Sequence, residues 1–175
     1  MNIDSLIDFT NEATKEIAKY KRDFILSQPK MIKKDKKYII STLDWNSVSY
    51  GPAEVNKVPN DKRGIYAFAI CQKSAVLPPH GYILYIGIAG RDSKRSLRKR
   101  YKDYLNEHEV RKRDGIARMI GTWHKVLRFF FAPVDDNVSS DDLKKLEQQL
   151  NTALMPPFSI NDLEADTKRK IRAFK

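Results

Sequence analysis

The chain contains very little cysteine and no long apolar run. Its single cysteine, Cys71, cannot form an internal disulfide framework and excludes a zinc site built from a cysteine cluster. No stretch approaches the roughly 18 consecutive apolar residues of a membrane span. The first residues, MNIDSLIDFTNEATKE, are too acidic and too amphipathic for a signal peptide. We therefore expect a cytoplasmic protein that makes no use of a membrane.

Acidic residues are also outnumbered. The 175 residues include 33 Lys and Arg against 22 Asp and Glu, a formal net charge of +11. Such an excess favours a polyanion as partner, although charge alone does not separate DNA from RNA, ribosome or membrane binding. One basic group closes the chain from Lys168 to Lys175, and a solvated helix face is the plain alternative for any such run. The other group, for which we expect DNA contacts, comprises Arg91, Lys94, Arg95, Arg98, Lys99, Arg111, Lys112, Arg113 and Arg118.

Residues 5–25 have the spacing of an amphipathic helix. Apolar residues recur at intervals of three and four, which keeps them on one stripe of a helix. The stripe consists of Leu6, Phe9, Ala13, Ile17, Tyr20 and Phe24. We expect it to pack on the core of its own domain. The alternative is a seam for a homodimer or for a protein partner.

The remaining pattern predicts a small α+β domain. Residues 65–70 and 82–88 are rich in β-branched and aromatic side chains and predict an antiparallel hairpin with a long loop, and residues 126–134 predict a third strand. Helices are expected at 95–107, 109–121 and 141–154, and a short strand at 38–40. The result is a three-stranded antiparallel sheet flanked by helices over residues 63–162. Residues 1–62 form an N-terminal helical extension, and residues 163–175 a basic C-terminal helix.

Two charged side chains occupy unusual positions on these helices. Glu147 falls within the apolar stripe of helix 141–154, where a carboxylate needs a cation, a metal or hydrogen-bond donors. A salt-bridged or rim-exposed glutamate is the plain alternative to a ligand for a hard divalent cation. Arg100 lies four residues before Tyr104, so the two side chains can act side by side, although Arg100 could equally cover apolar surface with its stem.

Two short motifs precede these residues, Gly64-Ile65-Tyr66 and Tyr85-Ile86-Gly87. With the Arg100 segment and the Glu147 helix that follow in order, they make residues 63–162 resemble the GIY-YIG nuclease superfamily. The resemblance implies a phosphodiester hydrolase that uses one divalent cation, Mg²⁺ or Mn²⁺. Glu147 would hold this metal, Tyr66 would act as the general base or pass on the proton of the attacking water, and Arg100 would stabilise charge on the phosphate.

The resemblance also extends to supporting residues and to the substrate. Tyr85 and Tyr104 would orient the water and the phosphate, and Asn161 would support the site by hydrogen bonds. The substrate would be double-stranded DNA, in a restriction, mobile-element or phage-defence setting. Two other functions remain open: a non-cutting nucleic-acid-binding module, and a nuclease subunit targeted by a partner protein through the helix at 5–25.

Overall fold

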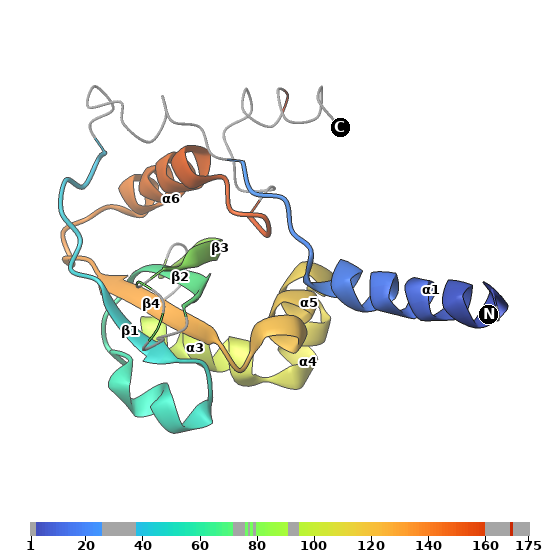
Figure 1. Ribbon diagram of the computed structural model, residues 1–175. Helices are drawn as coiled ribbons and strands as arrows, with labels where there is room; N and C mark the ends of the chain where they lie inside the picture. Colours follow the sequence, from blue (N-terminus) through green and yellow to red (C-terminus); the bar gives the residue numbers. More distant parts are fainter. Residues whose placement is uncertain are drawn as a thin grey trace.

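The computed structural model describes residues 3–25, 38–71, 76, 78, 80–90, 95–159 and 169 of the chain. It shows an α+β arrangement with a helix running out from the sheet domain (Figure 1). The helical elements are α1 (Ile3–Tyr20), the 3-10 helix η1 (Pro52–Lys57), α3 (Leu97–Leu105), α4 (Glu107–Arg111), α5 (Asp114–Trp123) and α6 (Ser140–Leu154). The strands are β1 (Asn46–Ser49), β2 (Gly64–Ile70), β3 (Tyr82–Ala89) and β4 (Leu127–Pro133). None of the described helices is long and apolar enough to cross a bilayer.

The sheet has four antiparallel strands in the order β1-β4-β2-β3, so the predicted three-stranded sheet is wrong by one strand. The three predicted strands are present, and the β2–β3 hairpin pairs Tyr66 with Gly87. The added strand, β1, pairs with β4 through the short sequence Asn-Ser-Val-Ser. Only Val48 of β1 is buried, and a strand with one apolar residue gives no alternating pattern. Residues 38–40, predicted as a strand, form no strand.

The helical segment after the hairpin is divided by capping residues. Ser96 caps α3 by accepting a hydrogen bond from the Lys99 amide. Asn106 then ends α3 and caps α4, because its side-chain oxygen accepts hydrogen bonds from the backbone amides of His108 and Glu109. The predicted helices 95–107 and 109–121 therefore become three shorter ones. Gly115, expected as an interruption, lies in the first turn of α5.

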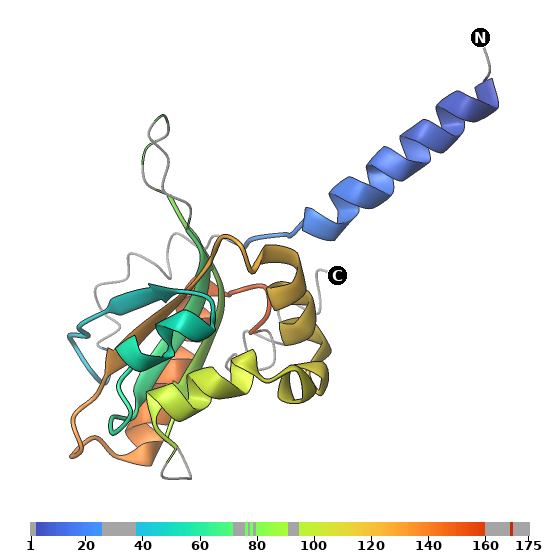
Figure 2. The same ribbon diagram turned by 90° about the horizontal axis from the view of Figure 1, so that it is seen from below.

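The sheet separates two cores of different character. On the α3 side the core is aromatic, with Tyr66, Phe68, Phe129, Tyr101 and Tyr104 in ring-to-ring contact. On the α6 side the core is aliphatic, and its buried members are Ile65, Ala67, Ile86, Ala132 and Leu146. Figure 2, seen from the α3 side, places α3 in front of the sheet, α6 behind it and α5 beside it. Residues of alternating parity along β2 and β4 supply the two cores. In β3 a register shift opposite Phe68 and Ala69 breaks this alternation, so that Leu84 belongs to the aromatic core and Ile86 to the aliphatic one.

Helix α6 begins and ends where the sequence predicts. Ser139 caps it by accepting from the Asp142 amide at 3.0 Å, and Met155 ends it in the left-handed conformation. The following segment closes the outer edge of β3, since the Phe158 amide donates to the Leu84 carbonyl and the Ile86 amide donates to Ser159 Oγ. An edge strand is thereby protected from pairing with another chain over these residues.

Helix α1 is helical as predicted, but its apolar stripe does not pack on the domain core. No residue of α1 is buried, and the helix projects away from the sheet in both views (Figures 1 and 2). Phe9 and Ile17 are 72% and 67% exposed. The prediction of core packing for this stripe is therefore wrong.

Candidate active site

The Tyr66 side chain lies at the centre of the candidate site. It projects from β2 into the aromatic core and is fully buried. Its hydroxyl lies 2.6 Å from the Tyr104 hydroxyl and accepts a hydrogen bond from Arg100 Nε at 3.0 Å. Because Arg100 donates to Tyr66, the Tyr66 proton is free to donate to Tyr104. Tyr85 adds a ring 6.2 Å from that of Tyr66. The structure thus brings together four of the six predicted catalytic residues.

Glycine at position 87 makes room for the Tyr66 hydroxyl. The two residues are paired across the β2–β3 ladder, and a Cβ at position 87 would lie 2.5 Å from Tyr66 Oη and 2.7 Å from Tyr66 Cζ. Gly64 has a similar role, because a Cβ there would meet the backbone carbonyl oxygen of Ala132. The glycines of both motifs therefore have a steric explanation in this fold.

We expect Gly87→Ala to destabilise the protein by about 1–3 kcal/mol, because the added methyl overlaps a buried phenol that has no room to move. Chemical denaturation monitored by circular dichroism measures the effect. Gly121→Ala is the matched control, since a Cβ at this α5 position meets nothing within 4 Å and alanine favours a helix. Equal stability of the Gly87 variant and the wild type would contradict the steric explanation.

Two arginines cover the tyrosine cluster. The Arg100 guanidinium lies 5.5 Å from the centre of the Tyr104 ring, and that of Arg113 lies 4.5 Å from the same ring. Arg100 also contacts Asp103 at 3.5 Å, and Asp103 accepts a second contact from Arg95 at 2.9 Å. From the sequence, Arg113 was predicted only as a DNA-contacting residue. Its place beside Tyr104 depends on the turn between α4 and α5, for which helical spacing gives no signal.

The electrostatics keep Tyr66 protonated in the free protein. Burial raises the pKa of Tyr66 well above its usual value of about 10, and Tyr104 and Tyr85 raise it further, while Arg100 opposes them. The role of general base requires the opposite shift. In this state Tyr66 is a neutral hydrogen-bonding group, and ionising it would need an additional positive charge near the hydroxyl.

Glu147 lies on the other side of the sheet from this cluster. It is half-buried on α6, which packs through Leu146 and Leu150 against the aliphatic core. The sheet therefore stands between the backbone of α6 and that of α3, which carries Arg100 (Figure 2). Asn161, the sixth predicted catalytic residue, lies outside the described residues.

One further polar residue on α6 bears on the metal prediction. Asn151 follows Glu147 by one helical turn and is fully buried, and neither its amide nitrogen nor its amide oxygen has a hydrogen-bond partner among the described residues. An orphaned buried amide is costly and calls for an explanation. Carboxylate and amide oxygens are donors that Mg²⁺ accepts, so the pair Glu147 and Asn151 fits a hard cation in its chemistry. The described part of the chain contains no cluster of three or more His, Cys, Asp or Glu suited to a metal.

We expect Asn151→Leu to raise the free energy of unfolding in metal-free buffer by about 1–3 kcal/mol, because an apolar side chain of similar size removes two unsatisfied polar atoms. The melting temperature, read with and without Mg²⁺, tests this. If Asn151 supplies a metal oxygen, the variant also loses any stabilisation that Mg²⁺ gives the wild type. Asn137→Leu, at an exposed position, is the control. A destabilised Asn151 variant would mean that the amide has a structural partner.

Comparison of the chain with protein-family models, with curated proteins and with solved structures finds no match. The resemblance to the GIY-YIG superfamily thus depends on the residues of the two motifs and of the segments that contain Arg100, Glu147 and Asn161.

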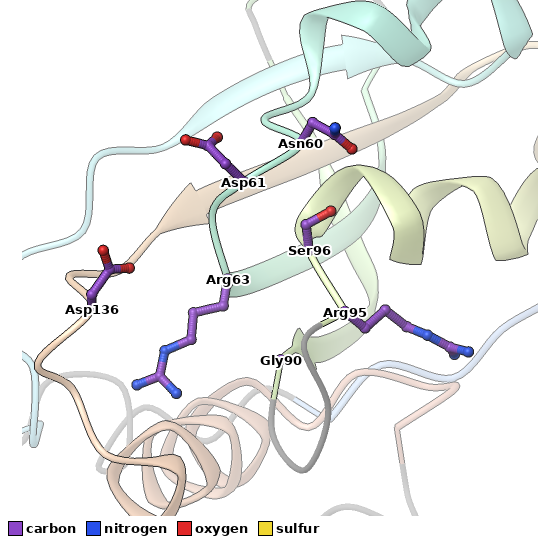
Figure 3. A pocket seen from close by; sticks show the side chains of 7 residues that line it. All are labelled: Asn60, Asp61, Arg63, Gly90, Arg95, Ser96 and Asp136. Atoms are coloured by element: carbon purple, nitrogen blue, oxygen red, sulfur yellow. The ribbon is translucent and has the colours of Figure 1, made fainter.

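A cavity of about 330 Å³ opens beside the start of α3 (Figure 3). Its lining consists of Asn60, Asp61, Arg63, Gly90, Arg95, Ser96 and Asp136. Arg63 and Arg95 point to opposite sides in this view, and the carboxylates of Asp61 and Asp136 offset their charge. The polar groups do not converge on one point, so this cavity is not the centre of the candidate site. It adjoins that site through Arg95, which shares Asp103 with Arg100.

Most of the predicted DNA-contacting cations lie on the surface. The exposed members are Arg95, Lys99, Arg111, Lys112 and Arg118. Arg98 differs, because it is half-buried and donates to the backbone carbonyls of Val58 and Asn56, at 2.7 and 2.9 Å, which ties α3 to η1. Arg91 and Lys94 lie outside the described residues.

Proposed function

We propose that this protein is a divalent-metal-dependent endonuclease that hydrolyses phosphodiester bonds in DNA. The observation that carries the proposal is the cluster of Tyr66, Arg100 and Tyr104, in which a guanidinium and two phenol hydroxyls lie within hydrogen-bond distance at the edge of a basic surface. A planar guanidinium suits a phosphate oxyanion, and the exposed cations of α3, α4 and α5 would attract and orient the strand. The basic balance of the whole chain agrees with this substrate class.

In this proposal Arg100 binds the reacting phosphate. Its side chain is 26% exposed, so part of the guanidinium is open to a ligand while Nε remains bonded to Tyr66. Arg113, above the same tyrosine ring, adds positive charge. Tyr66 and Tyr104 would orient the attacking water and receive or relay its proton, with Tyr85 beside them. A phosphate can reach the Tyr66 hydroxyl only if the arginines shift, because the residue is fully buried.

Glu147, with Asn151 one turn along α6, would hold the metal, and Asn161 would support the site. When bound, a divalent cation supplies Lewis-acid stabilisation of the leaving oxygen.

A second function is favoured by two specific observations. The pKa of Tyr66 is raised rather than lowered, and the sheet lies between the tyrosine cluster and α6. Both are compatible with a domain that binds nucleic acid through Arg100 and its neighbours without cutting it.

Nicking of supercoiled plasmid DNA separates the two functions. We expect the wild type to convert supercoiled to open-circular DNA with Mg²⁺ or Mn²⁺ but not with EDTA, and Glu147→Gln to abolish cutting while DNA binding in a gel-shift assay remains. Glu107→Gln, at an exposed α4 position, is the control for loss of a carboxylate. If no divalent cation supports cutting and binding is retained, the binding module replaces the nuclease as the function.

A further inference from the structure

Helix α1 exposes an apolar stripe that its own domain does not cover. The stripe includes Leu6, Phe9 and Ile17, which are 57%, 72% and 67% exposed, and none of the α1 residues is buried. A single helix of 18 residues is only marginally stable in water, so most of its stability must come from contacts along one face. A continuous stripe of this kind is the mark of a helix that packs against another surface.

The connection after α1 directs the helix away from its own domain. The Arg22 guanidinium lies 4.7 Å from the Trp123 ring and 5.5 Å from the Phe158 ring, and the Phe24 ring lies 5.1 Å from that of Tyr82. These contacts hold Arg22 beside α5 and Phe24 beside β3, and α1 runs outward from there (Figure 2).

A complementary apolar surface lies on the α6 side of the sheet. A groove of about 350 Å³ is lined by Trp45, Ala67, Ala69, Cys71, Gly81, Ile83 and Phe130. Trp45 and Ile83 are 42% and 36% exposed, so the described residues of the domain leave the groove open. Its small alanine and glycine positions leave a hollow between larger side chains, which is the shape that receives the ridge of a helix.

Helix α1 and the rest of the chain carry opposite net charges. Helix α1 carries four carboxylates, at positions 4, 8, 12 and 16, against two lysines, while the chain as a whole carries a net charge of +11. The helix is therefore acidic and the remainder of the chain strongly basic. An acidic helix is repelled by DNA and by anionic lipid but attracted to the body of a second copy. Arg128, which is paired with Ala69 in the sheet, places a cation on the same face as the groove.

We propose that two copies of this chain exchange their α1 helices, each laying its apolar stripe in the groove of the other. The exchange is reciprocal, so the contact has two-fold symmetry and closes without forming a filament. Each helix is about 27 Å long at 1.5 Å per residue. The reciprocal exchange makes two helix–groove contacts instead of one, which brings the buried area nearer to the roughly 1,200–2,000 Å² of a specific interface. The inference does not depend on the nuclease proposal.

Cys71 provides a direct readout, because the only cysteine of the chain lines the groove. Sedimentation of the full-length protein over a range of concentrations gives the fraction of dimer, and the rate of Cys71 alkylation gives the accessibility of the groove. We expect a dimer in which Cys71 alkylation slows in step with the fraction of dimer. Ile17→Asp, at an exposed stripe position, should weaken the dimer by about a hundredfold or more and restore fast alkylation, because it buries a charge.

Ile83→Asp in the groove should have the same effect as Ile17→Asp, and Asn11→Gln, which changes no charge on the exposed polar face of α1, should leave both readouts unchanged. Circular dichroism verifies that each variant is folded. A wild type that is monomeric at all concentrations would overturn the proposal. So would a dimer in which Cys71 reacts as fast as in the monomer, because the helices would then pair with each other, and so would a dimer that Ile17→Asp leaves intact.

Discussion

Replacing Arg100 by alanine is expected to lower the rate of DNA nicking by about 10²–10³-fold, because it removes the only guanidinium bonded to the Tyr66 hydroxyl among the described residues. Arg100→Lys should recover little of this loss. An ammonium group cannot keep Nε on Tyr66 and still present two donors to a phosphate. Single-turnover nicking at saturating protein measures the effect.

The neighbouring Lys99 provides the control for Arg100. It is exposed on the same helix, so Lys99→Ala removes an equal charge without touching the cluster. We expect that variant to weaken DNA binding slightly and to leave the single-turnover rate unchanged. If Lys99→Ala and Arg100→Ala reduce nicking equally, Arg100 acts by general charge and has no special place in the site.

Tyr66→Phe is expected to reduce nicking by about 10²–10⁴-fold, the usual loss when a group that transfers a proton is removed. The ring and its packing remain, so folding should be retained. The variant leaves Arg100 Nε and the Tyr104 hydroxyl without a shared partner, and we expect it to be less stable at neutral pH by about 1–3 kcal/mol. Tyr20→Phe, on exposed α1, is the matched control. Nicking at the wild-type rate by Tyr66→Phe would remove Tyr66 from the mechanism.

The pH dependence of stability gives Tyr66 a readout that is separate from activity. The folded protein holds the Tyr66 proton more tightly than the unfolded chain does, since burial raises its pKa. Stability is therefore unaffected below about pH 10 and falls as the pH rises from there through the folded pKa. In Tyr66→Phe the free energy of unfolding should therefore fall less steeply above pH 10 than in the wild type. Some fall should remain, because burial and Tyr101 also raise the pKa of Tyr50, to about 12.

Local signals in the sequence were sufficient for most of the sheet and for α6. The hairpin strands are dense in aromatic and β-branched residues, and α6 is bounded by a serine cap and two prolines. Strand β1 was not predicted, because its four residues are mostly polar. It also pairs with β4, which lies some eighty residues later in the sequence, as in the pair Ser47 and Phe130. The exposure of α1 was not predicted either, because an apolar stripe indicates that a helix packs against a surface but does not identify that surface.

The candidate site, like the fold, could be predicted from the sequence only in part. The proximity of Arg100 and Tyr104 follows from helical spacing, and the meeting of both with Tyr66 was expected only from the family resemblance. The place of Glu147 could not be predicted, because its stripe indicates contact with the sheet but not which face. Arg113 was predicted only as a DNA contact, because it reaches the tyrosine cluster through the turn between α4 and α5. Asn151 was not predicted, because the pattern of α6 does not mark an amide as buried.

The shared carboxylate of Asp103 has a consequence for how substrate would enter. The guanidinium groups of Arg95 and Arg100 both contact the half-buried Asp103 carboxylate, which balances part of their positive charge in the free protein. A phosphate that arrives at Arg100 competes with an internal anion already in place. Arg95 can retain Asp103 when Arg100 releases it, so the exchange leaves no stranded charge. In the proposed function Asp103 would thus stand in for the phosphate, holding the Arg100 guanidinium in position while lowering its affinity for the substrate.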